Sequence, residues 1–312
     1  MLNVRRFVKG ADEPLWIEVL NSARKERDDW RTVTIEDLLV DSERPSFDLE
    51  GRFIGELDGR AVGIVHAKVD DLIEDKKGFI HLNVVPEFRS SVIETALIEV
   101  ALDALKARGM AIAQTWADSS QRERIELLKS LKFRHIRVFS VMEMELAGFS
   151  ENMGENTEVA VRPLRKEMNY DIKLFNWLSN ETYRDDLDYS PVTLDESHHF
   201  LFCDPYLKVK EILFAVLNGE SVGCVGVGID EKLNLEKKVQ TGEVFTIGVL
   251  KAHRRKGIGA RLMLHGLERL KAKGMTRATL GVEDDNLTGA MKLYQKLGFR
   301  IKRRESVLER EV

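Results

Sequence analysis

The stretch Arg254-Arg255-Lys256-Gly257-Ile258-Gly259-Ala260 joins a β-rich run that ends at Val249 to an amphipathic, helix-like run that begins near Ile258. The first turn of a helix offers backbone N–H groups without intrahelical partners, together with the positive end of the helix dipole. Gly257 and Gly259 allow an anion to approach this backbone closely, because neither residue has a Cβ atom. The sequence therefore predicts a strand, a loop and a helix start that bind a phosphorylated ligand.

Basic side chains surround the same loop and add positive charge: Lys251, Arg254, Arg255 and Lys256. The loop is neither a Walker motif nor a dinucleotide fingerprint, because no Gly-Lys-Ser/Thr follows and one of the fingerprint glycines is missing. A basic, glycine-containing helix start on a solvated edge is the alternative interpretation. The surrounding sequence therefore has to decide between a ligand site and an ordinary surface loop.

The surrounding sequence consists of two related halves. Val84-Val85-Pro86-Glu87-Phe88-Arg89 in the first half matches Val249-Leu250-Lys251-Ala252-His253-Arg254 in the second, 165 residues later (249 − 84). Asp58-Gly59 and Asn218-Gly219 each separate two β-rich runs, as expected for tight hairpin turns. A repeat of this kind indicates gene duplication. The 312 residues are also about twice the usual single-domain length of roughly 150.

Each half predicts the same order of elements: a strand, one or two helices, a hairpin, a strand, a long helix, a strand, a helix and closing strands. This order predicts an α/β (α+β) fold, in which each of two tandem domains has a mixed, mostly antiparallel sheet flanked by helices. We expect domains at residues 1–147 and 158–312, joined by the polar linker 148–157. The elements expected in the second half are strand 159–162, helix 167–181, helix 195–202, the hairpin, strand 243–249, helix 258–273, strand 277–282, helix 288–297 and strands from 299 onward.

Composition excludes several classes of function. The chain has 48 basic and 52 acidic residues and a formal net charge of −4, which argues against a bulk nucleic-acid binder. Its two cysteines, Cys203 and Cys224, exclude a disulfide scaffold and a cysteine-rich metal site, and they favour a reducing cytoplasm. No apolar run approaches the roughly 18 residues that span a bilayer, and the first residues lack the apolar stretch of a signal peptide. We therefore expect a cytoplasmic protein that binds neither nucleic acid nor membrane.

The basic loop resembles the pyrophosphate motif, Gln/Arg-x-x-Gly-x-Gly/Ala, with which the GNAT (GCN5-related) N-acetyltransferase superfamily binds acetyl-CoA. A second run, Asn286-Leu287-Thr288-Gly289-Ala290-Met291-Lys292-Leu293-Tyr294-Gln295-Lys296-Leu297-Gly298-Phe299, resembles the second signature of that superfamily. Together the two motifs cover most of residues 241–300. The combination of an eroded first half and an intact second half resembles the tandem members of the superfamily, so we expect two tandem GNAT-like domains.

This resemblance implies an acetyl-CoA co-substrate and no metal ion. The backbone of Ile247, Gly248 and Val249 would contact the pantetheine arm, where the fourth and fifth strands of the second half splay apart. Asn286 would bind the same arm. The loop and helix start would hold the pyrophosphate through Arg254, Arg255, Lys256, Gly257, Ile258, Gly259 and Ala260.

The resemblance also implies direct transfer of an acetyl group to a primary amine, either of a small molecule or of a peptide or protein N-terminus. Glu243, at the start of the fourth strand, would be the general base, and Tyr294 would be the general acid that protonates the leaving thiolate. The ordinary phenol pKa near 10 suits a donor to a thiolate. An exposed carboxylate at a strand start and a core-packing tyrosine are the alternative interpretations of these two residues.

The acceptor side of the site would lie in the loop after the first helix of the second half. In the superfamily this loop usually meets the acceptor, which makes Asp185, Asp186 and Tyr189 candidates for an acidic lip that attracts a cationic amine. A solvated loop is the alternative interpretation. The adjacent carboxylates at residues 283–285 do not predict a metal site, because three neighbouring side chains cannot all face one ion.

The first half lacks the side chains that this chemistry needs. Val92 and Glu94 align with the two loop glycines, while Gly78 and Leu128 align with the base and the acid. A carboxylate repels pyrophosphate by about 1 kcal/mol even in water at about 4 Å. We therefore expect that the first domain does not bind acetyl-CoA productively and instead supports the second domain.

A non-catalytic CoA-binding regulator or scaffold, built from two GNAT domains, is the competing hypothesis. It predicts that catalytic groups are missing from both halves. Because Glu243 and Tyr294 are present in the second half, the sequence favours an acyltransferase. The acceptor amine and the oligomeric state are left open by these residues.

Overall fold

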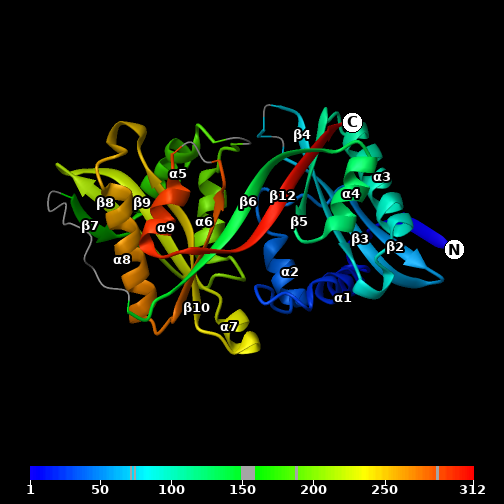
Figure 1. The fold of residues 1–312 in the computed structure, drawn as a ribbon, viewed down its shortest axis with the longest axis horizontal. Coiled ribbons are helices and arrows are strands. Elements are labelled where there is room, and N and C mark those ends of the chain that lie inside the picture. The colour runs from blue at the N-terminus through cyan, green and yellow to red at the C-terminus, as the bar shows by residue number, and fades with distance from the viewer. Residues whose placement is uncertain (71, 74, 149–158, 187–188, 286–287) are drawn as a thin grey trace. The chain divides into compact units, whose positions relative to one another are not determined.

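The computed structural model describes residues 1–70, 72–73, 75–148, 159–186, 189–285 and 288–312. The chain divides into two compact units, which we describe separately. Unit 1 comprises Met1–Phe139 and Arg303–Val312, and unit 2 comprises Ser140–Lys302. Both boundaries fall inside long strands, β6 (Arg134–Glu145) and β12 (Arg300–Glu311), so the last residues of the chain belong to the unit that begins it (Figure 1).

Unit 1 has the strand order β1-β2-β3-β4-β5-β12. Strands β4 and β5 are parallel, whereas the other pairs with a described register are antiparallel. One face carries α3 and α4 and the other carries α1 and α2, each over its own apolar core. The bounds are β1 (Leu2–Arg6), α1 (Glu13–Arg24), α2 (Ile35–Asp41), β2 (Arg52–Leu57), β3 (Arg60–Val69), β4 (Lys77–Val84), a 3-10 turn (Pro86–Phe88), α3 (Ser91–Ala107), β5 (Ile112–Asp118) and α4 (Arg122–Ser130).

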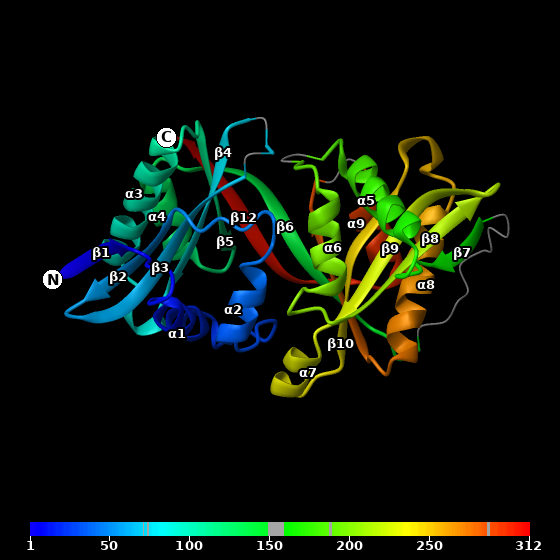
Figure 2. The same cartoon turned by 180° about the vertical axis from the view of Figure 1, so that it is seen from behind.

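Unit 2 repeats this design with the strand order β7-β8-β9-β10-β11-β6. Strands β10 and β11 are parallel, and β7 to β10 pair antiparallel. Helices α8 and α9 cover one face of the sheet (Figure 1), and α5 and α6 cover the other (Figure 2). The bounds are β7 (Val159–Pro163), α5 (Asn169–Tyr183), α6 (Leu194–Phe202), β8 (Val209–Leu217), β9 (Glu220–Ile229), α7 (Glu231–Lys237), β10 (Thr241–Val249), a 3-10 turn (Lys251–His253), α8 (Ile258–Ala272), β11 (Arg277–Glu283) and α9 (Ala290–Leu297).

The predicted α/β (α+β) fold with two tandem, mostly antiparallel units is confirmed. Helix α7 is the element that the sequence pattern did not predict. It begins because the Asp230 carboxylate accepts a hydrogen bond from the Leu233 N–H at 2.9 Å, which caps the helix. Seven residues between two strands give too little periodicity to mark a helix, and Leu235 on α7 is exposed.

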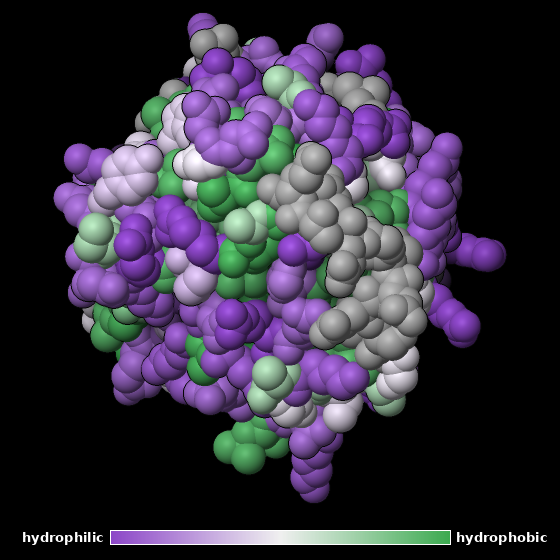
Figure 3. Space-filling model, turned by 90° about the vertical axis from the view of Figure 1, so that its left-hand side faces the viewer, coloured by the Kyte–Doolittle hydropathy of each residue, from purple (hydrophilic) through white to green (hydrophobic). Residues whose placement is uncertain are grey.

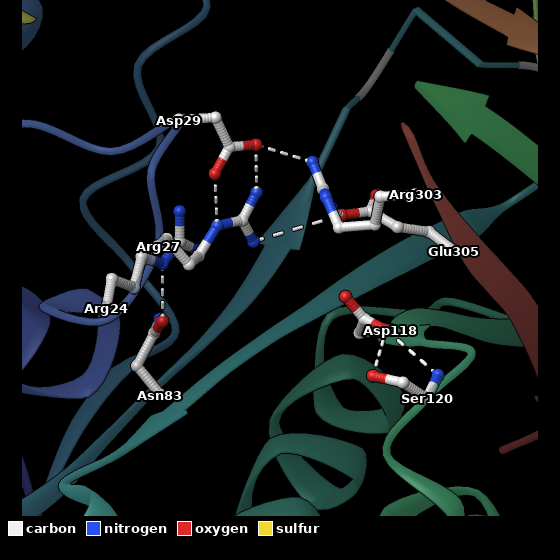
Figure 4. A network of polar contacts seen from close by, with 8 residues as sticks. All are labelled: Arg24, Arg27, Asp29, Asn83, Asp118, Ser120, Arg303 and Glu305. Carbon is white, nitrogen blue, oxygen red and sulfur yellow. Dashed lines mark hydrogen bonds and ion pairs between the residues drawn. The ribbon is translucent and has the colours of Figure 1, made fainter. Parts of the chain in front are cut away.

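The C-terminal strand β12 is part of the sheet of unit 1. Glu305 to Glu311 pair antiparallel with Asp118 to Ile112 of β5. Arg303 adds hydrogen bonds to Asp29, at 2.6 Å, and to Glu305, within a network of charged side chains (Figure 4). A strand of twelve residues extends about 40 Å, so β12 is long enough to belong to both units.

The compact units therefore differ from the expected domains by two exchanged strand segments. Residues 140–147 lie in unit 2 and residues 303–312 lie in unit 1, because β6 and β12 each continue past the boundary. Most of the predicted linker, 149–157, falls outside the described residues. The assignment of 1–147 and 158–312 as domains stays a prediction.

Both units have a glycine under the long helix of their larger core. A Cβ atom built on Gly78 would lie 2.3 Å from Cδ2 of Leu105, and one built on Gly242 would lie 2.4 Å from Cδ2 of Leu270. Such approaches are too short for any side chain, so the helix packs directly on the strand backbone. These two glycines are equivalent positions of the repeat, at an offset of 164 (242 − 78).

The offset of 164 corrects the sequence alignment of the general-base candidate. The register between β9 and β10 shifts between Val244 and Thr246, whereas β4 pairs with β3 without interruption. Strand β10 thus contains one extra residue, and the alignment of Glu243 with Gly78 is wrong by one position. Phe79 is the true counterpart of Glu243. The first unit still lacks a carboxylate there.

The surface is largely polar. Hydrophilic residues cover most of the face shown in Figure 3, with a smaller hydrophobic area near its centre, and 32% of the chain is charged. Among the helices described, none has the length and apolar character needed to cross a bilayer.

Candidate functional site

Strands β10 and β11 separate halfway along β10. Their parallel register ends at the pair Val244 and Leu280, with no later pair among the described residues of these strands. The register shift between Val244 and Thr246 falls at the same place. A bulge of this kind bends its strand and increases its twist. Among the described residues, the backbone of residues 245–249 therefore has no paired strand on the β11 side. Tyr183 and Arg254 instead hydrogen-bond to the backbone of Ile247 and Val249.

The side chains of β10 divide between the two faces of the sheet. Val244 is buried in the core beneath α8, so its neighbour Glu243 points to the face of α5 and α6, where it is exposed. Phe245 packs with the core of that same face. A Cβ atom built on Gly248 would lie 2.2 Å from Oγ1 of Thr182, so α5 touches the strand backbone here. Glu243 thus lies on the face from which the acceptor loop is built.

The basic loop ends in an open helix start. Gly257 precedes α8 with a φ of 79°, a conformation that favours glycine, and Arg255 also has a positive φ of 65°. A Cβ atom built on Gly257 would meet nothing within 4 Å. One built on Gly259 would lie 3.8 Å from Leu293 and from Val249, an ordinary contact. The first turn of α8, which includes Ile258, Gly259 and Ala260, is thus open to a ligand on the side of Gly257.

Arg254 binds the protein rather than the space in front of α8. Its Nε donates to the carbonyl oxygen of Val249 at 2.9 Å, and its NH2 donates to that of Thr182 at 3.0 Å. Its NH1 lies 3.9 Å from Asp185. Arg254 therefore connects the end of α5 to the basic loop, and its expected role in binding the pyrophosphate stays a prediction.

The other basic side chains surround the loop differently. Lys256 donates to the carbonyl oxygen of Ala252 at 3.2 Å. The guanidinium nitrogens of Arg255 would lie 3.7 Å from a Cβ atom built on Gly289, which begins α9. Arg255 therefore lies between the two helix starts that the family motifs form.

The three acceptor-side candidates have different surroundings. Asp185 forms an ion pair with Lys251 at 3.0 Å, which lowers the pKa of its carboxyl group and directs it to the basic loop. Burial raises the pKa of Asp186, which is half-buried, while the charge of Arg254 acts in the opposite direction. Tyr189 donates to Oδ1 of Asn180 at 2.9 Å and so fastens the loop to α5. The role of these three residues in binding an amine stays a prediction.

Tyr294 lies on α9 inside the core beneath α8 and α9, and only 6% of it is exposed. Its ring centroid is 6.1 Å from that of Phe299. Burial raises the pKa of Tyr294, so the phenol stays protonated at neutral pH. The position is compatible both with a proton donor and with the core-packing role.

Sequence reasoning missed Tyr183. Its hydroxyl donates to the carbonyl oxygen of Ile247 at 3.1 Å, accepts from the Ile247 N–H at 3.1 Å, and lies 3.2 Å from Oγ1 of Thr246. Burial raises the pKa of Tyr183. The expected helix ended at residue 181, two residues before the end of α5, so the tyrosine fell into the loop. Its position one turn before the acidic loop is the signal that could have revealed it.

Two further sequence candidates need separate mention. Asn286 lies outside the described residues. Asp284, one of the three adjacent carboxylates, accepts a hydrogen bond from the hydroxyl of Ser140. No group of three or more metal-ligating side chains occurs within the described ranges.

The helix start of α3 in unit 1 is occupied by the protein's own charges. Glu94, at the position of Gly259, accepts from Nε of Arg124 at 3.2 Å and from its NH2 at 3.0 Å. The hydroxyl of Ser90 accepts from the N–H of Ile93 and caps the helix. A buried carboxylate and its own arginine thus stand where unit 2 has an open turn.

Aromatic rings stack next to the corresponding strand separation in unit 1. The parallel pairing of β4 and β5 also ends early, at Ile80 and Thr115. Beyond it, His81 and Trp116 stack with centroids 5.7 Å apart and planes 3° apart. Trp116 corresponds to Gly281 of β11, at an offset of 165 (281 − 116). Where unit 2 has no side chain, unit 1 therefore has an indole.

A model of the "Acetyltransferase (GNAT) family" matches residues 173–299. This region includes the separated strands, the basic loop and both motif helices. The second unit belongs to the GNAT acetyltransferase family. The family expected from the two motifs is confirmed, and with it the assignment of the chain to the tandem GNAT fold.

Curated GNAT relatives match over different lengths. A mycothiol acetyltransferase of Thermomonospora curvata is 30% identical over 138 residues, which is 44% of this chain and 46% of that protein. A mycothiol acetyltransferase of Actinosynnema mirum is 27% identical over 268 residues, 82% of each chain. The match to the first of these relatives thus spans about half of its length.

Solved structures share the fold of the whole chain. A GCN5-related N-acetyltransferase from Sphaerobacter thermophilus has a TM-score of 0.73 at 20% identity, covering 99% of this chain and 95% of that one. A tandem GNAT protein from the clavulanic acid biosynthesis pathway has a TM-score of 0.75 at 14% identity, covering 100% of this chain and 98% of that one. At such identities the likeness concerns the fold.

Proposed function

We propose that unit 2 transfers an acetyl group from acetyl-CoA to a primary amine, with Glu243 as the general base and Tyr294 as the general acid. One observation carries this proposal: beyond Val244 the strand β10 has an edge that is not paired with β11, and this strand leads directly into the open first turn of α8. A ligand with an amide-containing arm and a pyrophosphate fits two such neighbouring features.

The proposed donor site uses backbone groups and the helix start. The pyrophosphate would accept hydrogen bonds from the first turn of α8, near Gly257 and Gly259, where the helix dipole favours an anion. The pantetheine amides would pair with the β10 edge between Ile247 and Val249, as strands pair with each other. Arg255 precedes α8 in the chain, and its guanidinium lies beside the start of α9.

The proposed chemistry needs a series of proton and charge movements. The ammonium of the acceptor loses a proton to Glu243, directly or through water, and the neutral nitrogen attacks the thioester carbonyl carbon. The oxygen of the tetrahedral intermediate is stabilised by a backbone N–H of the β10 edge, with Val249 as the candidate. The C–S bond then breaks, the Tyr294 hydroxyl protonates the thiolate, and the second proton lost by the nitrogen restores that hydroxyl directly or through water. The products are an amide and free CoA.

The acceptor would enter from the face of α5 and α6, where Glu243 and Asp186 lie. Asp186 is a half-buried carboxylate in the loop after α5 and would attract a cationic amine. The named activity of the curated relatives favours a small molecule as the acceptor over a peptide N-terminus. The pair of cysteines, of which Cys224 is buried and Cys203 exposed, fits action in a reducing cytoplasm.

Unit 1 would support unit 2 without binding acetyl-CoA. The Glu94 carboxylate with Arg124 already occupies its helix start, and the His81 and Trp116 rings stack beside its strand separation. An entering pyrophosphate would face a carboxylate instead of open backbone.

The proposal is tested by mixing the protein with acetyl-CoA and a panel of small primary amines and measuring the release of free CoA thiol. We expect release that depends on the amine, together with one acetyl-CoA bound per chain in calorimetry. A protein that binds acetyl-CoA but releases no CoA with any amine would instead fit the regulator hypothesis.

A further inference from the structure

The hydroxyl of Tyr183 hydrogen-bonds to both backbone groups of Ile247, on the edge of β10 that is not paired with β11. It accepts from the N–H of Ile247 and donates to its carbonyl oxygen, each at 3.1 Å. The carbonyl oxygen of one amide of a bound chain and the N–H of the next amide would make the same two contacts, as in paired strands. Since a backbone N–H donates one good hydrogen bond at a time, Tyr183 and a ligand amide compete for Ile247.

One contact of the hydroxyl itself and two contacts of the preceding residue hold the end of α5 in place. Oγ1 of Thr246 lies 3.2 Å from the Tyr183 hydroxyl, and Thr246 follows the bulge that turns the strand edge outward. Thr182, the preceding residue, touches the backbone at Gly248. The carbonyl oxygen of Thr182 accepts from Arg254 of the basic loop. The end of α5 is thus connected both to the strand edge and to the loop before α8.

We propose that Tyr183 sets the affinity for the acyl donor by occupying the amide position on Ile247 until a pantetheine amide displaces it. The inference rests on the proposed function of unit 2 and adds a residue that the family motifs do not contain. Displacement costs the free protein two hydrogen bonds, which the ligand then replaces. Removing the hydroxyl therefore removes the competitor and tightens donor binding.

Tyr183→Phe is the direct test, because it keeps the ring and removes only the hydroxyl. We expect acetyl-CoA to bind about tenfold more tightly in calorimetry, a factor that corresponds to about 1.4 kcal/mol. The ligand-free variant should melt at a lower temperature, since the N–H and carbonyl of Ile247 lose their partner. Its increase in melting temperature on adding acetyl-CoA should be larger than that of the wild type.

Two companion variants separate competition from general loosening. Asn176→Ala removes hydrogen bonds that join α5 to Val192 and Ser197 and should lower stability without changing acetyl-CoA affinity. Thr246→Val should tighten binding less than Tyr183→Phe, and the double variant should bind like Tyr183→Phe alone. If Tyr183→Phe fails to fold, Thr246→Val still decides the direction of the effect.

Hydrogen exchange of the Ile247 amide gives a readout that does not depend on catalysis. In the ligand-free protein, exchange should be slow in the wild type and fast in Tyr183→Phe, and acetyl-CoA should slow it in both. If the wild type binds acetyl-CoA and the Phe variant binds equally or more weakly, the competition is refuted and the proposed function stands. If neither protein binds acetyl-CoA, the proposed function fails and the competition fails with it.

Discussion

The guanidinium of Arg124 donates two hydrogen bonds to the carboxylate of Glu94, at the start of α3. In unit 2 the matching position is Gly259, beside an open helix turn. The helix start of unit 1 is thus occupied by the protein's own carboxylate and guanidinium, whereas the helix start of unit 2 is open. A single chain therefore contains two versions of one helix start, one filled by a carboxylate and its arginine and one open.

Calorimetry should find one acetyl-CoA site per chain, and Gly257→Val should weaken it at least tenfold. Valine at a φ of 79° is strained by about 1–2 kcal/mol, and its side chain would extend into the space in front of α8. Val92→Ala, at the matching position of unit 1, is the control and should leave binding unchanged. A stoichiometry of two would contradict the supporting role of unit 1.

Glu94→Ala should lower the free energy of unfolding by about 3 kcal/mol. The guanidinium of Arg124 is largely buried, and the substitution removes the carboxylate that balances its charge. Glu126→Ala, which breaks an exposed pair with Lys129 on the same helix α4, should cost less than about 1 kcal/mol. Urea unfolding of both variants measures the difference. Equal effects would mean that the Glu94 pair contributes no more than a surface contact.

Glu243→Gln should lower the turnover number by roughly 10²–10⁴-fold, the range typical of a lost general base. Acetyl-CoA affinity should remain unchanged, since the exposed side chain lies on the face opposite α8. Turnover across the pH range, alongside a calorimetric affinity, is the measurement. A variant with wild-type turnover at every pH would return Glu243 to an ordinary strand-start carboxylate.

Tyr294→Phe should slow the chemical step by roughly tenfold to a thousandfold, because it removes a proton donor and keeps the buried ring. Leu128 at the matching position of unit 1 is equally buried, so the fold accepts an apolar residue here. Single-turnover acetylation is the appropriate assay, since slow product release hides such effects in steady-state kinetics. Wild-type single-turnover rates would leave only the packing role.

Stability at acid pH should depend on Asp171, a fully buried carboxylate of α5. Burial opposes its ionisation, but hydrogen bonds from Arg165 and Arg162 outweigh burial and hold its pKa well below the usual range. Because the pKa of Asp171 is lower in the folded than in the unfolded protein, its ionised carboxylate contributes stability at pH values above the unfolded pKa of about 3.9. This contribution is lost as the pH falls from there through the folded pKa. Asp171→Asn should therefore cost about 2–3 kcal/mol at pH 7 and flatten the loss of stability below about pH 4. If the free energies of unfolding of the wild type and Asp171→Asn fall in parallel as the pH is lowered from 7 to below about 4, this account is contradicted.

Local sequence was sufficient for the repeat, the family and the two helix starts of the proposed site. Gly257 requires a positive φ, and Gly289 and Gly298 bound α9 in the same conformation. Such signals are short-range, because a glycine, a cap or a hydrophobic period acts within a few residues. The α/β order and the site loop could therefore be predicted before any tertiary contact was known.

Tertiary structure alone decided the register and the partners. The extra residue of β10 is visible only against β9 and displaced the alignment of Glu243 by one position. The direction of Arg254, the position of Tyr183 on Ile247, and the pairing of Glu305 to Glu311 with β5 also depend on segments far away in the sequence. Strand pairing and side-chain direction are set by which distant backbone lies alongside, and a one-residue shift moves a side chain to the other face. The amino-acid sequence shows which residue types are available, and long-range packing decides which of their atoms come into contact.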